Sequence, residues 1–131
     1  MDFYIHIFDD RPELNTIDKN AFADKIEILG NYELISGSIP DGENIYIVVM
    51  TLGYKSDELV IRKLIDKDVR YFGVLGSKAK MATMLKRLRA EGFDADGLAR
   101  IRTPVGVPIN SRTPEEIAIS IAAEIISVKN A

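Results

Sequence analysis

Along most of this chain, hydrophobic and polar positions follow either the pattern of a β-strand or that of an amphipathic helix. Short runs rich in β-forming residues predict strands at residues 3–8, 26–29, 45–50 and 69–75. Segments with apolar residues at helical spacing predict helices at residues 57–67, 78–91 and 93–99, and a last one from Pro114. Residues 45–50 are apolar throughout, which is typical of a strand covered on both faces.

This order of elements predicts an α/β fold of Rossmann type, with three layers and a mostly parallel sheet. No internal repeat or shift in composition divides the chain, so residues 1–131 are expected to form one domain. Residues 13–24 have weak periodicity and predict a loop with a helical turn. In the helix expected from residue 57, Ser56 is the predicted N-cap.

The last predicted helix has a recognisable N-terminal capping pattern and a mostly apolar surface. Thr113, Pro114 and Glu116 form the pattern of a capping box with proline at the first helical position. The helix is apolar nearly all round, and its narrow polar stripe consists of Glu116, Ser120, Glu124 and Ser127. We therefore expect this helix to be deeply packed or shared with a partner.

Composition narrows the function classes. The chain has no cysteine, which excludes disulfides, thiolate catalysis and cysteine-ligated metals. Its single histidine, His6, lies within a predicted strand and is expected to be packed there; no metal site is predicted. Net charge is −3 and basic residues are scattered, which argues against nucleic-acid binding. With no membrane-length apolar run and no secretory leader, a soluble cytoplasmic protein is expected.

The junction at Gly76 and Ser77 is the most informative part of the sequence. A predicted strand ends there, and the next helix has Lys78 and Lys80 in its first turn. Because a helix N-terminus already carries partial positive charge, two lysines at this position suggest a bound anion such as a phosphate. The alternative is that both lysines point into solvent and Ser77 is an ordinary N-cap.

Five motifs in a fixed order carry a family resemblance. They are Asp9-Asp10-Arg11-Pro12-Glu13, residues 48–54 (Val-Val-Met-Thr-Leu-Gly-Tyr), residues 73–78 (Gly-Val-Leu-Gly-Ser-Lys), residues 103–106 (Thr-Pro-Val-Gly) and residues 113–118 (Thr-Pro-Glu-Glu-Ile-Ala). In this combination the chain resembles the C-terminal Rossmann domain of xanthine dehydrogenase accessory proteins of the XdhC/CoxI type. The resemblance implies binding of molybdenum cofactor (molybdopterin) and a partner of the molybdenum-hydroxylase class, such as xanthine dehydrogenase.

The candidate binding residues come from these motifs. They are Asp9, Asp10, Thr51, Gly53, Gly76, Ser77, Lys78, Pro104 and Gly106. The two aspartates end a strand where a Rossmann fold places a ribose-binding carboxylate, or they cap the turn before Pro12. Thr51 and Gly53 follow a strand at its ligand-binding end, although Gly53 is alternatively a requirement of the turn.

The resemblance adds weight to the later motifs. The family has Gly-Ser-Arg where this chain has Gly76, Ser77 and Lys78, which favours the anion-binding interpretation. Pro104 and Gly106 match the family's Pro-x-Gly and are expected to shape the pocket wall. No catalytic residue is assigned, because Asp9, Asp10 and Lys78 do not form a convincing acid–base set, and a self-contained enzyme is not expected.

This chain also departs from the family pattern. The family's glycine-rich first βα turn precedes the Asp-Asp motif, whereas here the resemblance begins at Phe3; the family's N-terminal domain with its cysteine is missing too. Tyr54 and Leu52 replace a histidine and an arginine of the family. Without the first βα unit, two interior strands would have unpaired edges. We therefore expect a homodimer, a partner chain that completes the sheet, or a rearranged sheet.

Three functions are compatible with these observations. The favoured one is an accessory domain that holds a phosphorylated molybdenum cofactor, as molybdopterin or its nucleotide form, for maturation of a hydroxylase. The second is a nucleotide-binding oxidoreductase domain that uses NAD(P), which would need a glycine-rich dinucleotide loop. The third is a degenerate domain that has only an assembly role, with the last helix as its interface.

Overall fold

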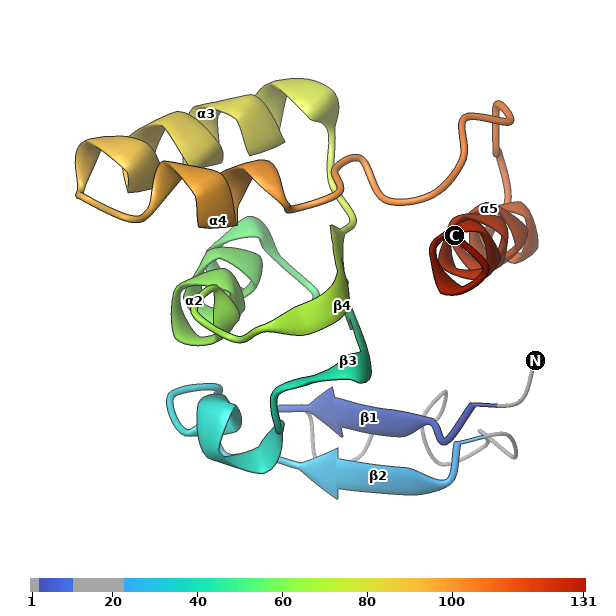
Figure 1. Cartoon of the computed structure of the whole chain (residues 1–131), viewed down its shortest axis with the longest axis horizontal. Coiled ribbons are helices and arrows are strands. Elements are labelled where there is room, and N and C mark those ends of the chain that lie inside the picture. Colours follow the sequence, from blue (N-terminus) through green and yellow to red (C-terminus); the bar gives the residue numbers. More distant parts are fainter. Residues whose placement is uncertain (1–2, 11–22) are drawn as a thin grey trace.

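The computed structural model describes residues 3–10 and 23–131, which contain both parallel strands and helices (Figure 1). The strands are β1 (His6–Asp9), β2 (Lys25–Ile28), β3 (Gly42–Val49) and β4 (Val69–Val74). The helices are the 3-10 helix η1 (Ile35–Ser38), α2 (Tyr54–Leu64), α3 (Lys78–Ala90), α4 (Ala95–Ala99) and α5 (Pro114–Lys129). Most of the loop predicted at residues 13–24 lies outside the described residues.

The four strands form two separate parallel pairs. β1 pairs with β2, with His6 opposite Lys25, and β3 pairs with β4, with Val48 opposite Gly73. Arg102 adds an isolated parallel bridge to Gly73 on the far edge of β4. Within the described residues no ladder joins β1 to β3, so the expected break in the sheet is present.

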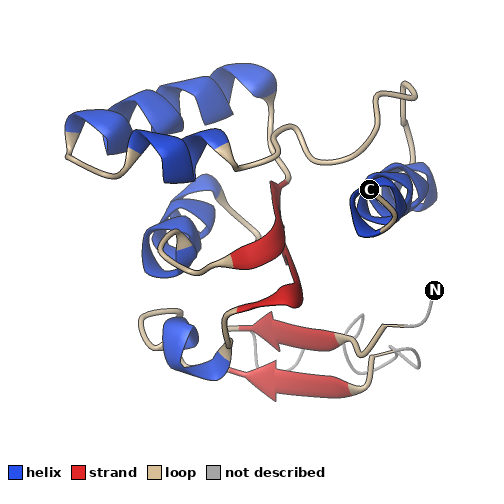
Figure 2. Cartoon of the chain, viewed as in Figure 1, coloured by secondary structure: helices blue, strands red, loops and turns tan. Residues whose placement is uncertain are grey.

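Helices cover both faces of the β3–β4 pair, as Figure 2 shows. Because side chains alternate along a strand, Ile47 and Val49 point to one face while Tyr46 and Val48 point to the other. The first face packs against apolar side chains of α2 and α3, which include Ile61, Leu64, Met84 and Leu88. The second face packs against α5 through Tyr71, Val105 and Ile121. This three-layer arrangement positions the loops that follow β3 and β4.

Local sequence signals located two helix starts correctly. The Oγ of Ser77 accepts a hydrogen bond from the backbone N–H of Lys80, so the predicted N-cap of α3 is confirmed. The capping box of α5 is also present, because Thr113 and Glu116 bond to each other's backbone N–H. These signals succeed because donor and acceptor are only three residues apart.

The start of α2 was predicted wrongly. The helix begins at Tyr54 with Gly53 at the N-cap, rather than at Asp57 with Ser56 as its cap. The reason is that the Asp57 carboxylate reaches back to the loop and accepts the N–H of Thr51. This bond leaves Asp57 inside the helix and draws the preceding residues into its first turn.

Burial also differs from two predictions. Residues 45–50 are less completely covered than expected, because only Ile47 and Val49 are buried and Met50 is 52% exposed. Helix α5 is not deeply packed within this chain: its buried residues are Ser120 and Ile121, while Ile119 is 62% exposed, so only the other alternative, a helix shared with a partner, stays a prediction. Among the described residues, none of the helices combines the length and hydrophobicity needed to cross a bilayer.

Candidate functional site

The loops after β3 and β4 lie at one end of a parallel pair. Because the two strands run in the same direction, Thr51 and Gly53 follow one strand at the end where Gly76, Ser77 and Lys78 follow the other. The N–H of Leu75 donates to the carbonyl of Val49 at 2.9 Å, which ties the two strand ends together. Five of the predicted site residues are therefore brought to one edge.

The start of α3 has hydrogen-bond donors that remain available. Ser77 satisfies two of the first N–H groups, because its side chain accepts from Lys80 and its carbonyl accepts from Met81. The N–H groups of Lys78 and Ala79 have no acceptor among the described residues. The side chains of Lys78 and Lys80 are exposed and have no carboxylate partner in this part of the chain. This donor set is suited to a phosphate.

The loop after β3 is held by a buried carboxylate. Asp57, which is 8% exposed, accepts from the N–H of Thr51 at 2.8 Å and from its hydroxyl at 2.7 Å. The hydroxyl of Thr51 already donates its proton to Asp57, so its oxygen can only accept a hydrogen bond from a ligand. Gly53 has φ −148°, and a Cβ there would meet open space. The turn therefore does not require glycine at this position.

Pro104 and Gly106 line a cavity of about 300 Å³ between the end of β4 and α5. Gly106 has φ +98°, and a Cβ on it would lie 2.2 Å from the Oγ of Ser120. That serine donates to the carbonyl of Val107 at 2.6 Å. The expectation that Pro104 and Gly106 shape a pocket wall agrees with this geometry, and Gly106 is needed for close approach to the helix.

Glu124 holds this wall in place from α5. Its Oε1 accepts from the Tyr71 hydroxyl at 2.6 Å and from the Gly106 N–H at 3.1 Å, and its Oε2 lies 3.8 Å from Nη1 of Arg102. Burial, followed by the hydrogen bond to Glu124, raises the pKa of the Tyr71 phenol well above its ordinary value. Tyr71 therefore stays a neutral donor at physiological pH, and the carboxylate is an acceptor for two separate elements.

Asp9 and Asp10 lie at the end of β1, in the other strand pair. Asp9 is buried and Asp10 is exposed, and neither lines the cavity beside Pro104. The rest of their motif lies outside the described residues. His6 is half-buried in β1 with its ring centroid 4.0 Å from that of Phe8, as expected for a packed strand residue.

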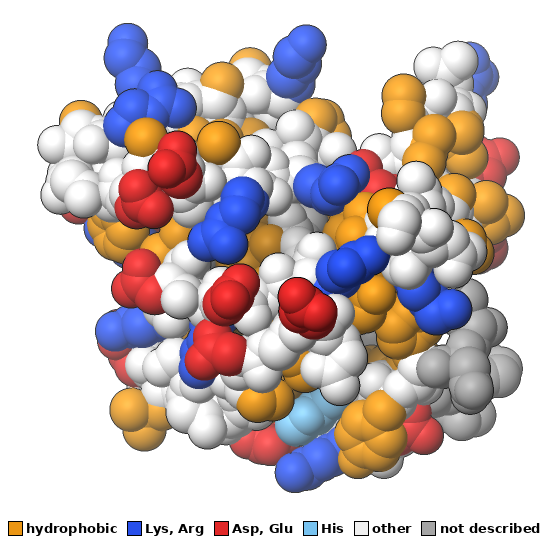
Figure 3. All heavy atoms as spheres, in the orientation of Figure 1, with side chains coloured by type: hydrophobic (Ala, Val, Ile, Leu, Met, Phe, Trp, Pro, Cys, Tyr) orange, Lys and Arg blue, Asp and Glu red, His pale blue; other side chains and the backbone are white. Residues whose placement is uncertain are grey.

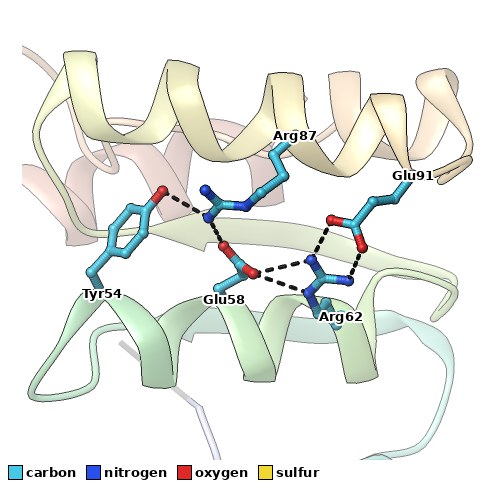
Figure 4. Close-up of polar contacts among 5 residues, drawn as sticks. All are labelled: Tyr54, Glu58, Arg62, Arg87 and Glu91. Atoms are coloured by element: carbon cyan, nitrogen blue, oxygen red, sulfur yellow. Dashed lines mark hydrogen bonds and ion pairs between the residues drawn. The ribbon is translucent and has the colours of Figure 1, made fainter.

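A polar network joins α2 to α3 and includes the residue that replaces the family's histidine (Figure 4). Arg62 makes a bidentate pair with Glu91 at 3.0 and 2.6 Å and also bonds to Glu58. Arg87 contacts Glu58 and donates to the Tyr54 hydroxyl at 3.1 Å. The hydrogen bond from Arg62 lowers the pKa of Glu91. Tyr54 thus bonds across to the neighbouring helix.

A second cavity, of about 320 Å³, has a basic lining formed by Lys67, Arg70, Arg100 and Arg102. Figure 3 shows Lys and Arg side chains across the middle of the face in view, over the region between α4, β4 and α5. The arginines have partners within the chain, because Arg70 donates to the Val128 carbonyl and Arg100 lies 3.8 Å from Asp68. In the part of the chain that the structure describes, no group of acidic or histidine side chains could hold a metal ion.

Sequence reasoning missed two residues that organise this region, Asp57 and Glu124. Asp57 was interpreted as the start of a helix, and Glu124 as part of a polar stripe. For Glu124 the available signal was a carboxylate within an otherwise apolar segment, which is costly to bury without partners; Asp57 lies among polar residues and gave no such signal. Their partners come from other elements, so the pattern along the chain does not identify them.

Comparison with known proteins agrees with this architecture. The XdhC Rossmann domain model matches residues 1–125. Over 74 residues the chain is 42% identical to the uncharacterized protein YqeB of Escherichia coli K12, and over 82 residues it is 37% identical to a probable xanthine dehydrogenase subunit of Bacillus subtilis 168. These alignments cover 56% and 63% of this chain but only 14% and 23% of those proteins.

A solved structure has the same arrangement. A crystal structure described as a xanthine dehydrogenase from Bacillus halodurans superposes with a TM-score of 0.78 at 29% identity, covering 98% of this chain and 36% of that one. The expected Rossmann-like fold is thereby confirmed. The family model matches nearly the full length, so this chain belongs to the XdhC Rossmann-domain family.

Proposed function

We propose that this chain is an accessory domain of a molybdenum-hydroxylase system that binds a phosphorylated molybdenum cofactor. The observation that carries the proposal is the start of α3, where two N–H groups and two lysines without partners among the described residues adjoin the Ser77 cap. Membership of the XdhC Rossmann family, and a relative named as a probable xanthine dehydrogenase subunit, support a hydroxylase of xanthine dehydrogenase type as the partner.

The residues present are compatible with the phosphate of such a cofactor. Lys78 and Ala79 would offer backbone N–H groups, and the ammonium groups of Lys78 and Lys80 would balance the negative charge. Pro104 and Gly106 would form an adjoining wall that Glu124 holds rigid. The bound cofactor would supply the redox chemistry to the hydroxylase, while this chain would bind, orient and release it.

Calorimetric titration of the protein with molybdopterin tests this proposal. Lys78→Glu should weaken binding by about tenfold or more, since it places negative charge beside the phosphate. Lys86→Glu is the matched control, because it makes the same charge change on an exposed lysine further along α3. Equal affinities for both variants, or no heat with the wild type, would exclude the α3 site.

The same titration separates the alternative functions. Binding of NADH or NADPH in preference to molybdopterin would favour a nucleotide-dependent oxidoreductase domain. An assembly role is favoured by the exposed apolar side chains of α5, Ile119 and Ile126. It would predict that Ile119→Lys disrupts a complex with the hydroxylase while Lys78→Glu changes no ligand response.

A further inference from the structure

The second cavity, of about 320 Å³, lies beside the first residues of β4, and all the charged side chains that line it are basic. Lys67 precedes β4, Arg70 belongs to it, and Arg100 and Arg102 follow α4. No aspartate or glutamate of the described residues contributes to the lining. In a chain whose net charge is −3, four positive charges around one cavity repel each other unless an anion lies between them.

Two carboxylates near the cavity compensate only part of this charge. Oδ1 of Asp68 lies 3.8 Å from Nη1 of Arg100, and Oε2 of Glu124 lies 3.8 Å from Nη1 of Arg102. The Asp68 side chain is 92% exposed, so water screens its charge. The other two cations form no ion pair within the described residues. Four positive charges therefore face two negative ones, which favours a ligand with two negative charges.

Hydrogen-bond donors around the cavity also lack acceptors in the described part of the chain. Both 3.8 Å distances exceed the length of a hydrogen bond, and the guanidinium groups of Arg100 and Arg102 make no other hydrogen bond there. The Phe72 carbonyl accepts from the Arg102 N–H, so the Phe72 N–H points to the same edge of β4, where none of these residues accepts it. Guanidinium groups and backbone N–H groups are typical donors to phosphate and carboxylate oxygens.

The location and size of the cavity indicate a small ligand that is separate from one at α3. The cavity adjoins the beginning of β4, whereas α3 follows the end of that strand. A volume of about 320 Å³ is within the range of small-molecule sites. Apart from the four cations the lining is largely apolar, and it includes Ile65, Phe72 and Ile101. A compact apolar body that carries an anionic group would match both parts of this lining.

From these observations we propose that the cavity beside β4 binds a small dianion, either a phosphate monoester or a dicarboxylate, on a compact apolar body. Arg100 and Arg102 would donate to the anionic oxygens, and the Phe72 N–H would be a further donor. Arg70 donates to the Val128 carbonyl at 2.8 Å, which holds its guanidinium in place without neutralising it. The inference does not depend on the cofactor or on the α3 site.

Titration of the isotope-labelled chain, followed by the NMR shifts of its amides, provides the test. The probes are phenyl phosphate and phthalate, which carry the two kinds of dianion on the same ring, and benzyl alcohol is the uncharged control. The amides of Phe72, Gly97 and Ile101 should shift in a saturable way with one or both dianions only. Arg100→Gln should raise the dissociation constant about tenfold or more, because it removes a charged donor. Arg89→Gln, the same change on an exposed arginine of α3, should leave it unchanged.

Each outcome decides the proposal. A tighter response to phenyl phosphate would assign a phosphate ester, and a tighter response to phthalate a dicarboxylate; both support it. No saturable shift at the cavity, or equal effects of Arg100→Gln and Arg89→Gln, overturns it. Shifts confined to Lys78 and Ala79 also overturn it, since the dianion would then bind only at α3. Tighter binding of a glutamate-rich peptide at the cavity amides overturns it in favour of a protein partner. Lys67→Gln is the second variant if Arg100→Gln does not fold, and it should weaken binding in the same direction.

Discussion

Strands β4 and β1 were both predicted from short β-forming runs, but they have different surroundings. Both are short and rich in β-forming residues, yet residues 71–74 of β4 are buried in succession whereas in β1 only Asp9 is buried. Helices lie on both sides of β4, and β3 and Arg102 pair with its edges. β1 has a ladder on one edge only among the described residues. Burial is thus conferred by neighbouring elements rather than by a strand's own composition.

The largest expected effect is a loss of stability, which is compared for one isoleucine in each of the two regions. Ile61 on α2 is fully buried beside the β3–β4 pair, whereas Ile28 on β2 is 43% exposed. Ile61→Ala should lower the free energy of unfolding by about 2–5 kcal/mol through lost burial and a cavity, and Ile28→Ala by less than about 1 kcal/mol. Urea unfolding measures both. Equal losses would show that the β1–β2 pair is as well packed as the other.

The second prediction concerns the α5 layer that covers β4. Glu124→Ala should leave the Tyr71 hydroxyl and the Gly106 N–H without an acceptor, and should lower unfolding free energy by about 2–4 kcal/mol. Ser127→Ala, on an exposed position of the same helix, is the control and should be nearly neutral. A loss for Glu124→Ala no greater than that of the control would mean that α5 is not held by this carboxylate.

A third prediction compares two glycines at the candidate site. Gly106→Ala should cost about 1–3 kcal/mol, because the added Cβ meets Ser120 at a positive φ. Gly53→Ala should cost less than about 1 kcal/mol, since the backbone there is extended and the space is open, and the only expected loss is the advantage of glycine over alanine at the N-cap of α2. Thermal unfolding of the two variants measures this difference. A large loss at Gly53 would contradict the loop geometry.

The smallest expected effect is a pH dependence in the α2–α3 layer. The Arg62 pair lowers the pKa of Glu91 in the folded state, so the unfolded state binds this proton more readily. The pair's stabilisation is therefore complete above the ordinary glutamate pKa of about 4.3 and is lost as pH falls through the lower, folded value. Glu91→Gln should make the midpoint of urea unfolding depend less on pH over this acid range. Glu43→Gln, at an exposed position, should leave the pH dependence unchanged.

Much of the fold follows from local patterns. The strand at residues 69–75, the N-cap Ser77 and the capping box of Thr113 and Glu116 were predicted because each depends on neighbouring residues. The order of apolar strands and helices was enough to predict a parallel α/β architecture. The missing ladder between β1 and β3 in the described residues was also expected, because the given sequence does not contain the βα unit that comes first in the family pattern.

Other features depend on contacts between distant residues. Asp57 set the start of α2 by bonding to Thr51, and Glu124 joined α5 to Tyr71 and Gly106. The sequence pattern placed Ser120 and Glu124 on a polar stripe but did not show which way it faces. In the structure Ser120 is buried against the segment after β4, while Ile119 is exposed. The candidate cavity exists because of this orientation.

The sequence by itself determined the α/β pattern and the basic start of α3, because hydrophobic periodicity and capping act over a few residues. Only the tertiary structure decided which apolar residues are buried and which carboxylates hold the site. Those outcomes depend on packing between elements that are far apart in the chain. For that reason two strands that were both predicted from β-forming runs became a covered β4 and a half-exposed β1.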